Sequence, residues 1–268
     1  MSIKLALSGA AGRMGRRLLA LSDQDAAFEL VQAIEWSGFP QLGKMINADS
    51  PIAPRAAGVA WTSELRPGAD IVVDFSSPAS IVNNARAAEL SGTRMLVGTT
   101  GLEADQLDAL KSASRKVAVL LAPNFSLGVN LLFKLAAETA KVLGDEYNIE
   151  IVESHHNQKV DAPSGTALGI ARAVAAELDR DLETDMVNGR SGKPGKRSAR
   201  EIGMHALRMG SVIGEHSVYF CNDFERIEIV HRAESRDIFA SGALRAAKWL
   251  MNQEPGWYIM RDMLFENA

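Results

Sequence analysis

The chain has 268 residues, which is enough for one large or two moderate domains, each with its own core. Hydrophobic residues make up 47% of the sequence, as in an ordinary globular protein, and the formal net charge of −4 argues against a dedicated nucleic-acid-binding protein. The single cysteine excludes an internal disulfide framework and favours the cytoplasm, and no apolar run approaches the length of a membrane span.

The first half of the sequence alternates short apolar segments with helical patterns. An apolar strand begins almost at the first residue, so no signal peptide is expected before the fold. The expected strands are 3–7, 28–34, 71–75, 94–97 and 117–121. The expected helices begin near residue 12, at 79 and at 103. This alternation predicts an α/β fold, a Rossmann-like parallel sheet covered by helices on both faces.

A glycine-rich turn follows the first strand and opens the first helix, which is the context that a dinucleotide-binding loop requires. Its glycines are Gly9, Gly12 and Gly15, and Ala11 stands where the usual pattern has a second glycine. Glu35 lies 20 residues after Gly15, at the end of the second strand, where a carboxylate can accept hydrogen bonds from ribose hydroxyls. Together these features predict a nicotinamide nucleotide site.

The pattern changes near residue 125, and the chain beyond it indicates an α+β unit. The expected helices are 126–143, 164–178 and 241–251. The expected strands are 147–152, 204–209, 212–220 and 226–231. Short turns join the last three strands, so they are expected to pair antiparallel. The segment 188–200 is rich in Gly, Lys, Arg and Ser, and an exposed linker is favoured there over a role in steering substrate.

The most informative segment connects the strand at 147–152 to the helix at 164–178. It contains His155, His156 and Lys159, followed by a small-residue turn whose backbone N–H groups lie at a helix N-terminus. Histidine titrates near neutral pH, and a helix N-terminus favours an anion such as a carboxylate. We therefore expect a catalytic site. A metal site is disfavoured, because adjacent side chains on an extended chain point to opposite faces and no His-Glu-x-x-His motif is present.

The segment 153–167 resembles the signature of the 4-hydroxy-tetrahydrodipicolinate reductase family, also called the dihydrodipicolinate reductase family. Further matching segments follow the family's order and cover nearly the whole chain: 9–15, 73–78, 97–101, 122–126 and 231–236. The resemblance implies an oxidoreductase that reduces 4-hydroxy-tetrahydrodipicolinate, a cyclic dicarboxylate, to tetrahydrodipicolinate with NADH or NADPH. This reaction belongs to bacterial diaminopimelate and lysine biosynthesis.

The resemblance also implies roles for individual residues. His155 is expected to act as general acid/base and Lys159 as proton donor, while the substrate is expected to be bound by His156, Gly165 and Thr166. The residues expected to bind the cofactor are Gly9, Ala10, Ala11, Gly12, Arg13, Met14, Glu35, Gly98, Thr99, Thr100, Ala122, Pro123, Asn124 and Phe125. No metal, nucleic acid or membrane is expected as a partner.

Two domains are implied by the same resemblance. The dinucleotide-binding domain is expected at 1–126 plus 237–268, and a substrate-binding and oligomerisation domain at 127–236. Hinge closure is expected to bring the catalytic segment onto the nicotinamide. A homotetramer built through the sheets of the second domain is also implied, and the strand expected at 212–220 suits that purpose.

The residue after Glu35 bears on the choice of nucleotide. Many members of the family have arginine there, where it can receive the 2′-phosphate of NADPH, whereas this chain has Trp36. We therefore expect NADH to be preferred and NADPH to remain usable. Arg13 and Arg16 lie in or just after the glycine loop, and they are the residues that could reverse this preference.

Two other functions are weighed against a reductase. One is a different oxidoreductase on the same plan, such as an amino-acid or homoserine dehydrogenase, and the other is a non-catalytic nucleotide-binding module that senses redox state. Neither needs adjacent histidines with Lys159 and the small-residue turn. The intact segment 155–166 therefore disfavours both.

Overall fold

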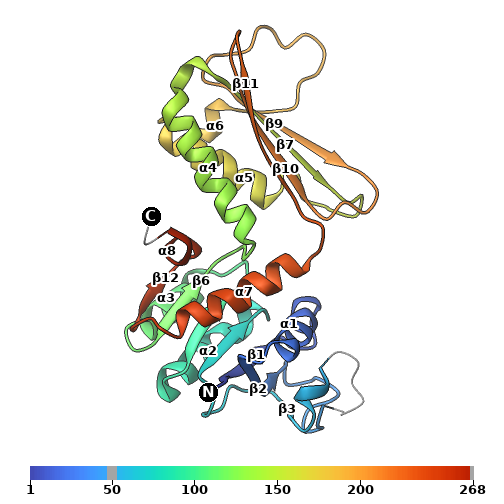
Figure 1. Cartoon of the computed structure of the whole chain (residues 1–268), viewed down its shortest axis with the longest axis vertical. Helices are drawn as coiled ribbons and strands as arrows, with labels where there is room; N and C mark the ends of the chain where they lie inside the picture. The colour runs from blue at the N-terminus through green and yellow to red at the C-terminus, as the bar shows by residue number, and fades with distance from the viewer. Residues whose placement is uncertain (47–52, 266–268) are drawn as a thin grey trace. The chain divides into compact units, whose positions relative to one another are not determined.

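The structure is a computed structural model that describes residues 1–46 and 53–265. The chain divides into two compact units, one made of Met1–Ser126 with Asp237–Ala268 and the other of Leu127–Arg236. The first unit is thus discontinuous in sequence, and its last part is contributed by the C-terminal segment, drawn in orange and red in Figure 1.

A seven-stranded parallel sheet forms the centre of the first unit (Figure 1). Its strands are β1 (Ile3–Ser8), β2 (Phe28–Ile34), β3 (Trp61–Thr62), β4 (Ile71–Asp74), β5 (Arg94–Val97), β6 (Ala118–Leu121) and β12 (Gly256–Tyr258). They lie in the order β12-β6-β5-β4-β1-β2-β3, so the direction of winding reverses between β1 and β4. Ligands of open α/β sheets bind at such a switch point, beyond the carboxyl ends of the strands.

Helices of the first unit pack in pairs, α1 with α7 and α2 with α3. These helices are α1 (Arg13–Gln24), α2 (Pro78–Ser91), α3 (Ala104–Ala113), α7 (Asp237–Leu250) and the short α8 (Met260–Phe265), and a 3-10 turn covers Pro54–Ala56. Arg17 of α1 donates two hydrogen bonds of 2.6 Å to the Asp237 carboxylate at the start of α7. The returning segment is therefore bound to the first helix as well as to the sheet.

The central strands are buried because helices cover both faces of the sheet. All four residues of β4 are buried, as are the last four residues of β1. Such strands are near-continuous apolar runs, the pattern that the sequence shows at these positions. The expected Rossmann-like α/β fold is confirmed. The short strands β3 and β12 were not expected, because two or three residues carry too little periodicity to indicate a strand.

The second unit is a five-stranded sheet packed on one face by helices (Figure 1). Its strands are β7 (Asn148–His155), β8 (Met186–Asn188), β9 (Ile202–Arg208), β10 (Glu215–Cys221) and β11 (Arg226–Arg232). Its helices are α4 (Leu127–Leu143), α5 (Gly165–Glu177) and α6 (Leu182–Asp185), with a 3-10 turn at Gly144–Glu146. None of the helices in the described ranges, in either unit, has the length and apolar character that a bilayer-spanning helix requires.

Alternation along the strands explains the core of the second unit. Ile149 and Ile151 of β7 and Val218 and Phe220 of β10 are fully buried, together with apolar residues of α4 and α5. The residues between them in sequence are only partly buried, because they lie on the opposite face of the sheet. A period of two thus places one face of these strands against the helices.

The pairing of this sheet differs from the expectation. β10 and β11 pair antiparallel as expected, but β9 pairs parallel with β7, and β7 lies between β9 and β10. The expected antiparallel pairing of the strands at 204–209 and 212–220 is therefore wrong. A hydrophobic pattern specifies which face of a strand is buried, and it does not specify the neighbour of that strand.

Two strand boundaries differ from the expectation by three residues, and one of them matters for the site. β10 begins at Glu215, three residues after the expected start at 212, and β7 continues to His155, beyond the expected end at 152. His155 is consequently held by the ladder of the sheet, with its carbonyl accepting a hydrogen bond of 2.9 Å from Met209 N–H. It is part of a rigid element and not of the connecting loop.

Arginines of the segment 188–200 are bound to the sheet. Arg190 and Arg197 both donate to the Glu150 carboxylate of β7, at 2.6 and 3.1 Å. A Cβ on Gly203 would lie 1.8 Å from this carboxylate, so the glycine leaves the room that Glu150 occupies. Hydrogen bonds from the arginines and His205 lower the pKa of Glu150 to about 2, against the opposing effect of burial. Arg190 and Arg197 thus anchor the segment to the sheet, which a purely exposed linker would not do.

Candidate active site

The glycine loop closes tightly at the carboxyl end of β1. Gly9 has a φ of +76°, and a Cβ there would lie 2.5 Å from the carbonyl oxygen of Phe75. A Cβ on Gly15 would lie 2.1 Å from the carbonyl oxygen of Gly9, so only glycine permits this approach of α1 to the loop. Gly12 is the N-cap of α1 and has no side chain with which to cap the helix. The first turn of α1 therefore presents backbone N–H groups to an anion.

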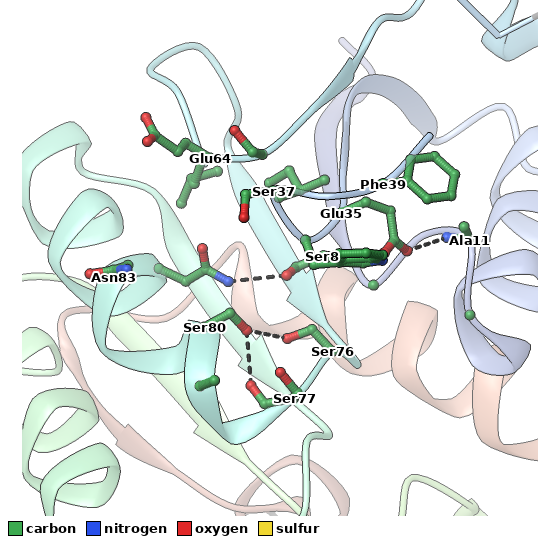
Figure 2. Close-up of a pocket in the computed structure, with 18 of the residues that line it drawn as sticks. Ser8, Ala11, Glu35, Ser37, Phe39, Glu64, Ser76, Ser77, Ser80 and Asn83 are labelled. Atoms are coloured by element: carbon green, nitrogen blue, oxygen red, sulfur yellow. Dashed lines mark hydrogen bonds between the residues drawn. The ribbon is translucent and has the colours of Figure 1, made fainter. Parts of the chain in front are cut away.

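A cavity of about 1050 Å³ lies beside this loop, at the carboxyl ends of β1, β2 and β4. Figure 2 shows Glu35 pointing toward the glycine loop, with Ser37 and Phe39 beside it and Ser76, Ser77, Ser80 and Asn83 across the cavity. The polar side chains from the loop before α2 and from its first turns were not expected at this site. Ser76 and Ser77 lie in the matching segment 73–78, whereas nothing in the pattern around Ser80 and Asn83 distinguishes them from an ordinary exposed face of a helix.

Glu35 and the glycine loop are joined directly. The backbone N–H of Ala11 donates a hydrogen bond of 2.7 Å to the Glu35 carboxylate (Figure 2). The same cavity is lined by Trp36, a residue that is 67% exposed, and by Arg16. A carboxylate for ribose hydroxyls, a helix N-terminus for a pyrophosphate and aromatic faces for a base meet in one cavity. These residues fit a dinucleotide.

The residues expected on the nicotinamide side lie elsewhere in the first unit. Gly98, Thr99 and Thr100 follow β5, which is next to β4, and the segment 122–125 follows β6, which is next to β5, so both groups are at carboxyl ends of strands. None of them lines the cavity described above. The rings of Phe125 and Phe75 are 5.6 Å apart, which links the end of β6 to the loop after β4.

A buried carboxylate holds the loops after β4 and β5. Asp74 is fully buried and accepts hydrogen bonds from Ser76 Oγ at 2.6 Å, from Thr99 Oγ1 at 2.7 Å and from Asn84 Nδ2 at 2.7 Å. These donors are all neutral. Because they come from three separate segments, Asp74 fixes the position of Thr99 relative to the start of α2.

Replacing Asp74 by alanine should lower the free energy of unfolding by about 3 kcal/mol or more, because several buried donors lose their acceptor at once. Urea denaturation followed by circular dichroism measures the effect. Asp70→Ala is the matched control, since Asp70 is only half-buried and accepts a single backbone hydrogen bond, from Lys4, of 2.8 Å. Equal losses of stability in the two variants would contradict the role given to Asp74.

The second unit brings His155 against a buried carboxylate. His155 Nδ1 lies 2.6 Å from Glu153 Oε2, and the Glu153 side chain is fully buried. Arg208 of β9 binds the same carboxylate with two hydrogen bonds of 2.9 Å, and Ser164 N–H donates to it at 3.1 Å. Hydrogen bonds from Arg208 and His155 keep the pKa of Glu153 below its usual value despite burial. The carboxylate is therefore ionised at neutral pH.

A second imidazole lies next to His155. His216 of β10 is 3% exposed, and its ring meets the ring of His155 edge-on at a centroid distance of 5.3 Å. His216 Nε2 is 3.2 Å from Ser164 Oγ. Burial lowers the pKa of His216 to about 3, so this imidazole is neutral at physiological pH. Burial also lowers the pKa of His155 below its usual value, and the Glu153 carboxylate opposes that shift.

The other expected residues follow on the same segment. Lys159 Nζ is 2.8 Å from both carboxylate oxygens of Asp161, and Arg236 lies 3.5 Å from His156 Nε2. Ser164 is the N-cap of α5, where its Oγ accepts a hydrogen bond of 3.2 Å from Ala167 N–H. Gly165 and Thr166 are therefore the first two residues of the helix. In the described ranges, no group of three or more His, Cys, Asp or Glu residues is placed to hold a metal ion.

Glu153 and His216 were not among the expected site residues, although the sequence contains a signal for both. Glu153 has the same parity along β7 as the buried Ile149 and Ile151, and His216 has the same parity along β10 as the buried Val218. A charged or titratable residue at an inward-facing position of a strand must be paired or functional. Applied to these strands, the rule would have selected both residues.

Comparisons with known proteins show the family and the fold of the chain. Residues 3–125 match a family model described as the N-terminus of dihydrodipicolinate reductase, and residues 128–264 match the model of its C-terminus. The chain is 44% identical to the 4-hydroxy-tetrahydrodipicolinate reductases of Magnetococcus marinus and Thiobacillus denitrificans, with 98% of the chain and 99% of each relative covered. It shares the fold of a dipicolinate-bound dihydrodipicolinate reductase from Paenisporosarcina sp. TG-14, with a TM-score of 0.75, 22% identity and coverage of 99% of this chain and 100% of that one.

Proposed function

The chain belongs to the dihydrodipicolinate reductase family, and on that premise we propose that it reduces 4-hydroxy-tetrahydrodipicolinate to tetrahydrodipicolinate in the cytoplasm. The family consists of oxidoreductases of lysine and diaminopimelate biosynthesis, with a pyridine nucleotide in the N-terminal Rossmann-type domain. The observation that carries the proposal is the acid–base arrangement of His155 with Glu153, on the same segment as Lys159 and the start of α5. A redox sensor or a dehydrogenase of the same fold has no need for it.

The first unit binds the nucleotide in this proposal. The first turn of α1 faces the pyrophosphate, and the loop from Gly9 to Met14 lies along the nucleotide. Glu35 accepts hydrogen bonds from the adenosine ribose. The nicotinamide half is held by the ends of β5 and β6, from Gly98 to Thr100 and from Ala122 to Phe125. The bound nucleotide supplies the hydride.

The second unit binds the substrate and moves protons. A carboxylate of the substrate is bound by the backbone of Gly165 and Thr166 at the N-terminus of α5, and His156 contributes a further contact. Lys159 attracts the carboxylates and donates a proton to the developing negative charge. His155 acts as general acid/base, because an imidazole exchanges a proton near neutral pH.

NADH is the preferred nucleotide. Trp36 directly follows Glu35, lines the cavity and has no charge to offer a 2′-phosphate, while the Glu35 carboxylate repels one. Of the two arginines near the glycine loop, Arg16 lines the cavity and Arg13 does not. The Arg16 Nε–H already donates a hydrogen bond of 2.9 Å to the carbonyl of Ala11. That bond directs part of the guanidinium toward the loop and away from a 2′-phosphate. Because Arg16 still lines the cavity, NADPH remains usable.

The protein should form a homotetramer through the sheet face of the second unit that lies opposite α4 and α5. Val152, Ser217 and Val230 are neighbours across β7, β10 and β11 on this face, and none of them is buried. Light scattering at micromolar concentration should give the mass of four chains, and Ser217→Arg should reduce it. Ser112→Arg, on the exposed side of α3, is the matched control. A monomeric mass for the native protein would remove the claim.

A coupled assay tests the proposed reaction. Pyruvate, aspartate semialdehyde and the synthase that precedes this step are supplied, and oxidation of NADH or NADPH is followed by absorbance. Oxidation should depend on both the synthase and the chain. If the chain binds the nucleotide but does not oxidise it while the synthase is shown to turn over, the protein is a sensor and the proposed reductase activity is wrong.

A further inference from the structure

Glu153 is a charged residue in the interior of the second unit, and each of its two carboxylate oxygens has two hydrogen-bond partners. Oε1 accepts from Ser164 N–H at 3.1 Å and from Arg208 at 2.9 Å, while Oε2 accepts from Arg208 at 2.9 Å and lies 2.6 Å from His155 Nδ1. Burying an ionised carboxylate is costly unless it is paired and hydrogen-bonded. Arg208 and Ser164 satisfy that requirement. The bond to His155 is an additional one.

This bond determines which nitrogen of His155 carries a proton. An ionised carboxylate only accepts hydrogen bonds, so the nitrogen facing Glu153 must be the donor. The neutral imidazole then has its lone pair on Nε2 and exchanges protons there. A Cβ on Gly214 would lie 3.1 Å from His155 Nε2, so the glycine leaves room on the side where exchange takes place.

We propose that Glu153, held in place by Arg208, is a positioning residue that fixes the tautomer and ring orientation of His155. The inference rests on the acid–base role proposed above for His155, and it extends that role to two residues that do not contact substrate. The arrangement is the one that a buried aspartate makes with the histidine of a serine protease triad. Here the Glu153 carboxylate is itself oriented by two hydrogen bonds from Arg208 of the neighbouring strand β9.

The charges around His155 make the proposal testable by titration. The groups that face it are Glu153 of its own strand, Arg208 of β9, His216 of β10 and Lys159 of the following loop. Burial, Lys159 and Arg208 all lower the pKa of His155, and among these charged groups only Glu153 raises it. Removing the Glu153 carboxylate and removing the Arg208 guanidinium should therefore shift the pKa of His155 in opposite directions.

Glu150 provides a matched control within the same strand. It lies three residues before Glu153 on β7, is bound by Arg190 and Arg197, and has its own imidazole partner, with His205 Nε2 at 2.8 Å. Glu150 thus has the same kinds of partner as Glu153, namely arginines and a histidine, but it does not contact His155. A general effect of removing a paired glutamate from β7 would appear equally in Glu150→Gln.

The first experiment is NMR titration of the full-length protein with ¹⁵N-labelled imidazoles, with His155 assigned from His155→Asn. Native His155 should be protonated at Nδ1 in its neutral form. Glu153→Gln should lower its pKa by about 1–3 units, the usual effect of an adjacent opposite charge, and Arg208→Gln should raise it. Glu150→Gln should leave it unchanged. A native Nε2–H tautomer, or no shift of opposite sign in the two variants, would overturn the proposal.

The second experiment is steady-state kinetics in the coupled assay. Glu153→Gln should lower kcat by about 10²–10⁴-fold without changing KM for the nucleotide, and Glu153→Asp, which restores the charge, should recover part of the loss. Should the native protein fail to turn over, the proposed function falls, and the titration still decides whether Glu153 positions His155. Should Glu153→Gln fail to fold, the sign of the Arg208→Gln shift decides the question alone.

Discussion

Replacing His155 or Lys159 by alanine should lower kcat by about 10²–10⁴-fold, the range for a positioned acid or base. The imidazole of His155 is held at the end of β7 by Glu153, and Lys159 follows four residues later on the segment that leads into α5. Both residues belong to the second unit, whereas the glycine loop and Glu35 belong to the first. The dissociation constant for the nucleotide should therefore stay near its native value in both variants.

The coupled assay gives kcat, and fluorescence titration gives the affinity for nucleotide. His205→Ala is the control for the imidazole, because His205 lies on β9 and is bound to Glu150. Lys141→Ala, in the last turn of α4, is the control for the ammonium. Near-native turnover in His155→Ala would remove the acid–base role of that residue, and near-native turnover in Lys159→Ala would remove the proton-donor role.

The substitution Trp36→Arg should shift the ratio of kcat/KM for NADPH over NADH upward by about one to two decades. A charged hydrogen-bond partner contributes about 1.5–3 kcal/mol, which corresponds to this range in affinity. Trp36 is largely exposed and lines the cavity beside Glu35, so an arginine there has room to reach a 2′-phosphate. The native protein should favour NADH.

Two further variants separate the contributions of charge and shape. Trp36→Ala removes the indole without adding a cation, and it should change the two nucleotides nearly equally. Arg16→Ala should reduce kcat/KM for NADPH more than for NADH, because Arg16 is the remaining cation that lines this cavity near the glycine loop. A native preference for NADPH that disappears in Arg16→Ala would show that Arg16 outweighs Trp36.

The sequence predicts the first unit well because its strands are buried on both faces. Runs such as 71–73 are apolar throughout and lie between helical patterns, so both their type and their parallel pairing follow from the alternation. The glycine loop and Glu35 are predicted to meet, and the hydrogen bond from Ala11 joins them. The polar lining from the start of α2 was missed, because serine and asparagine on an exposed helix face carry no distinctive signal.

Prediction was less successful in the second unit. The faces of β7, β9 and β10 follow from alternation, but the insertion of β7 between the other two depends on long-range pairing that no local pattern records. Similarly, the expected site stopped at the residues of the segment 155–166. Arg208 binds Glu153 and His216 meets the ring of His155, each from a neighbouring strand, and their proximity follows from the register of the sheet.

The return of the chain to the first unit has a consequence for synthesis. α7 packs on α1 and on β4, β5 and β6, and β12 forms the edge of the sheet next to β6. Ribosomes deliver the chain from its N-terminus, so the unit that begins the sequence lacks the helix α7 and an edge strand until translation is almost finished. The inserted unit has all its residues in one continuous stretch and is available to fold earlier. Until α7 emerges, the apolar residues of β4, β5 and β6 that it covers remain exposed, and such surface is prone to aggregation.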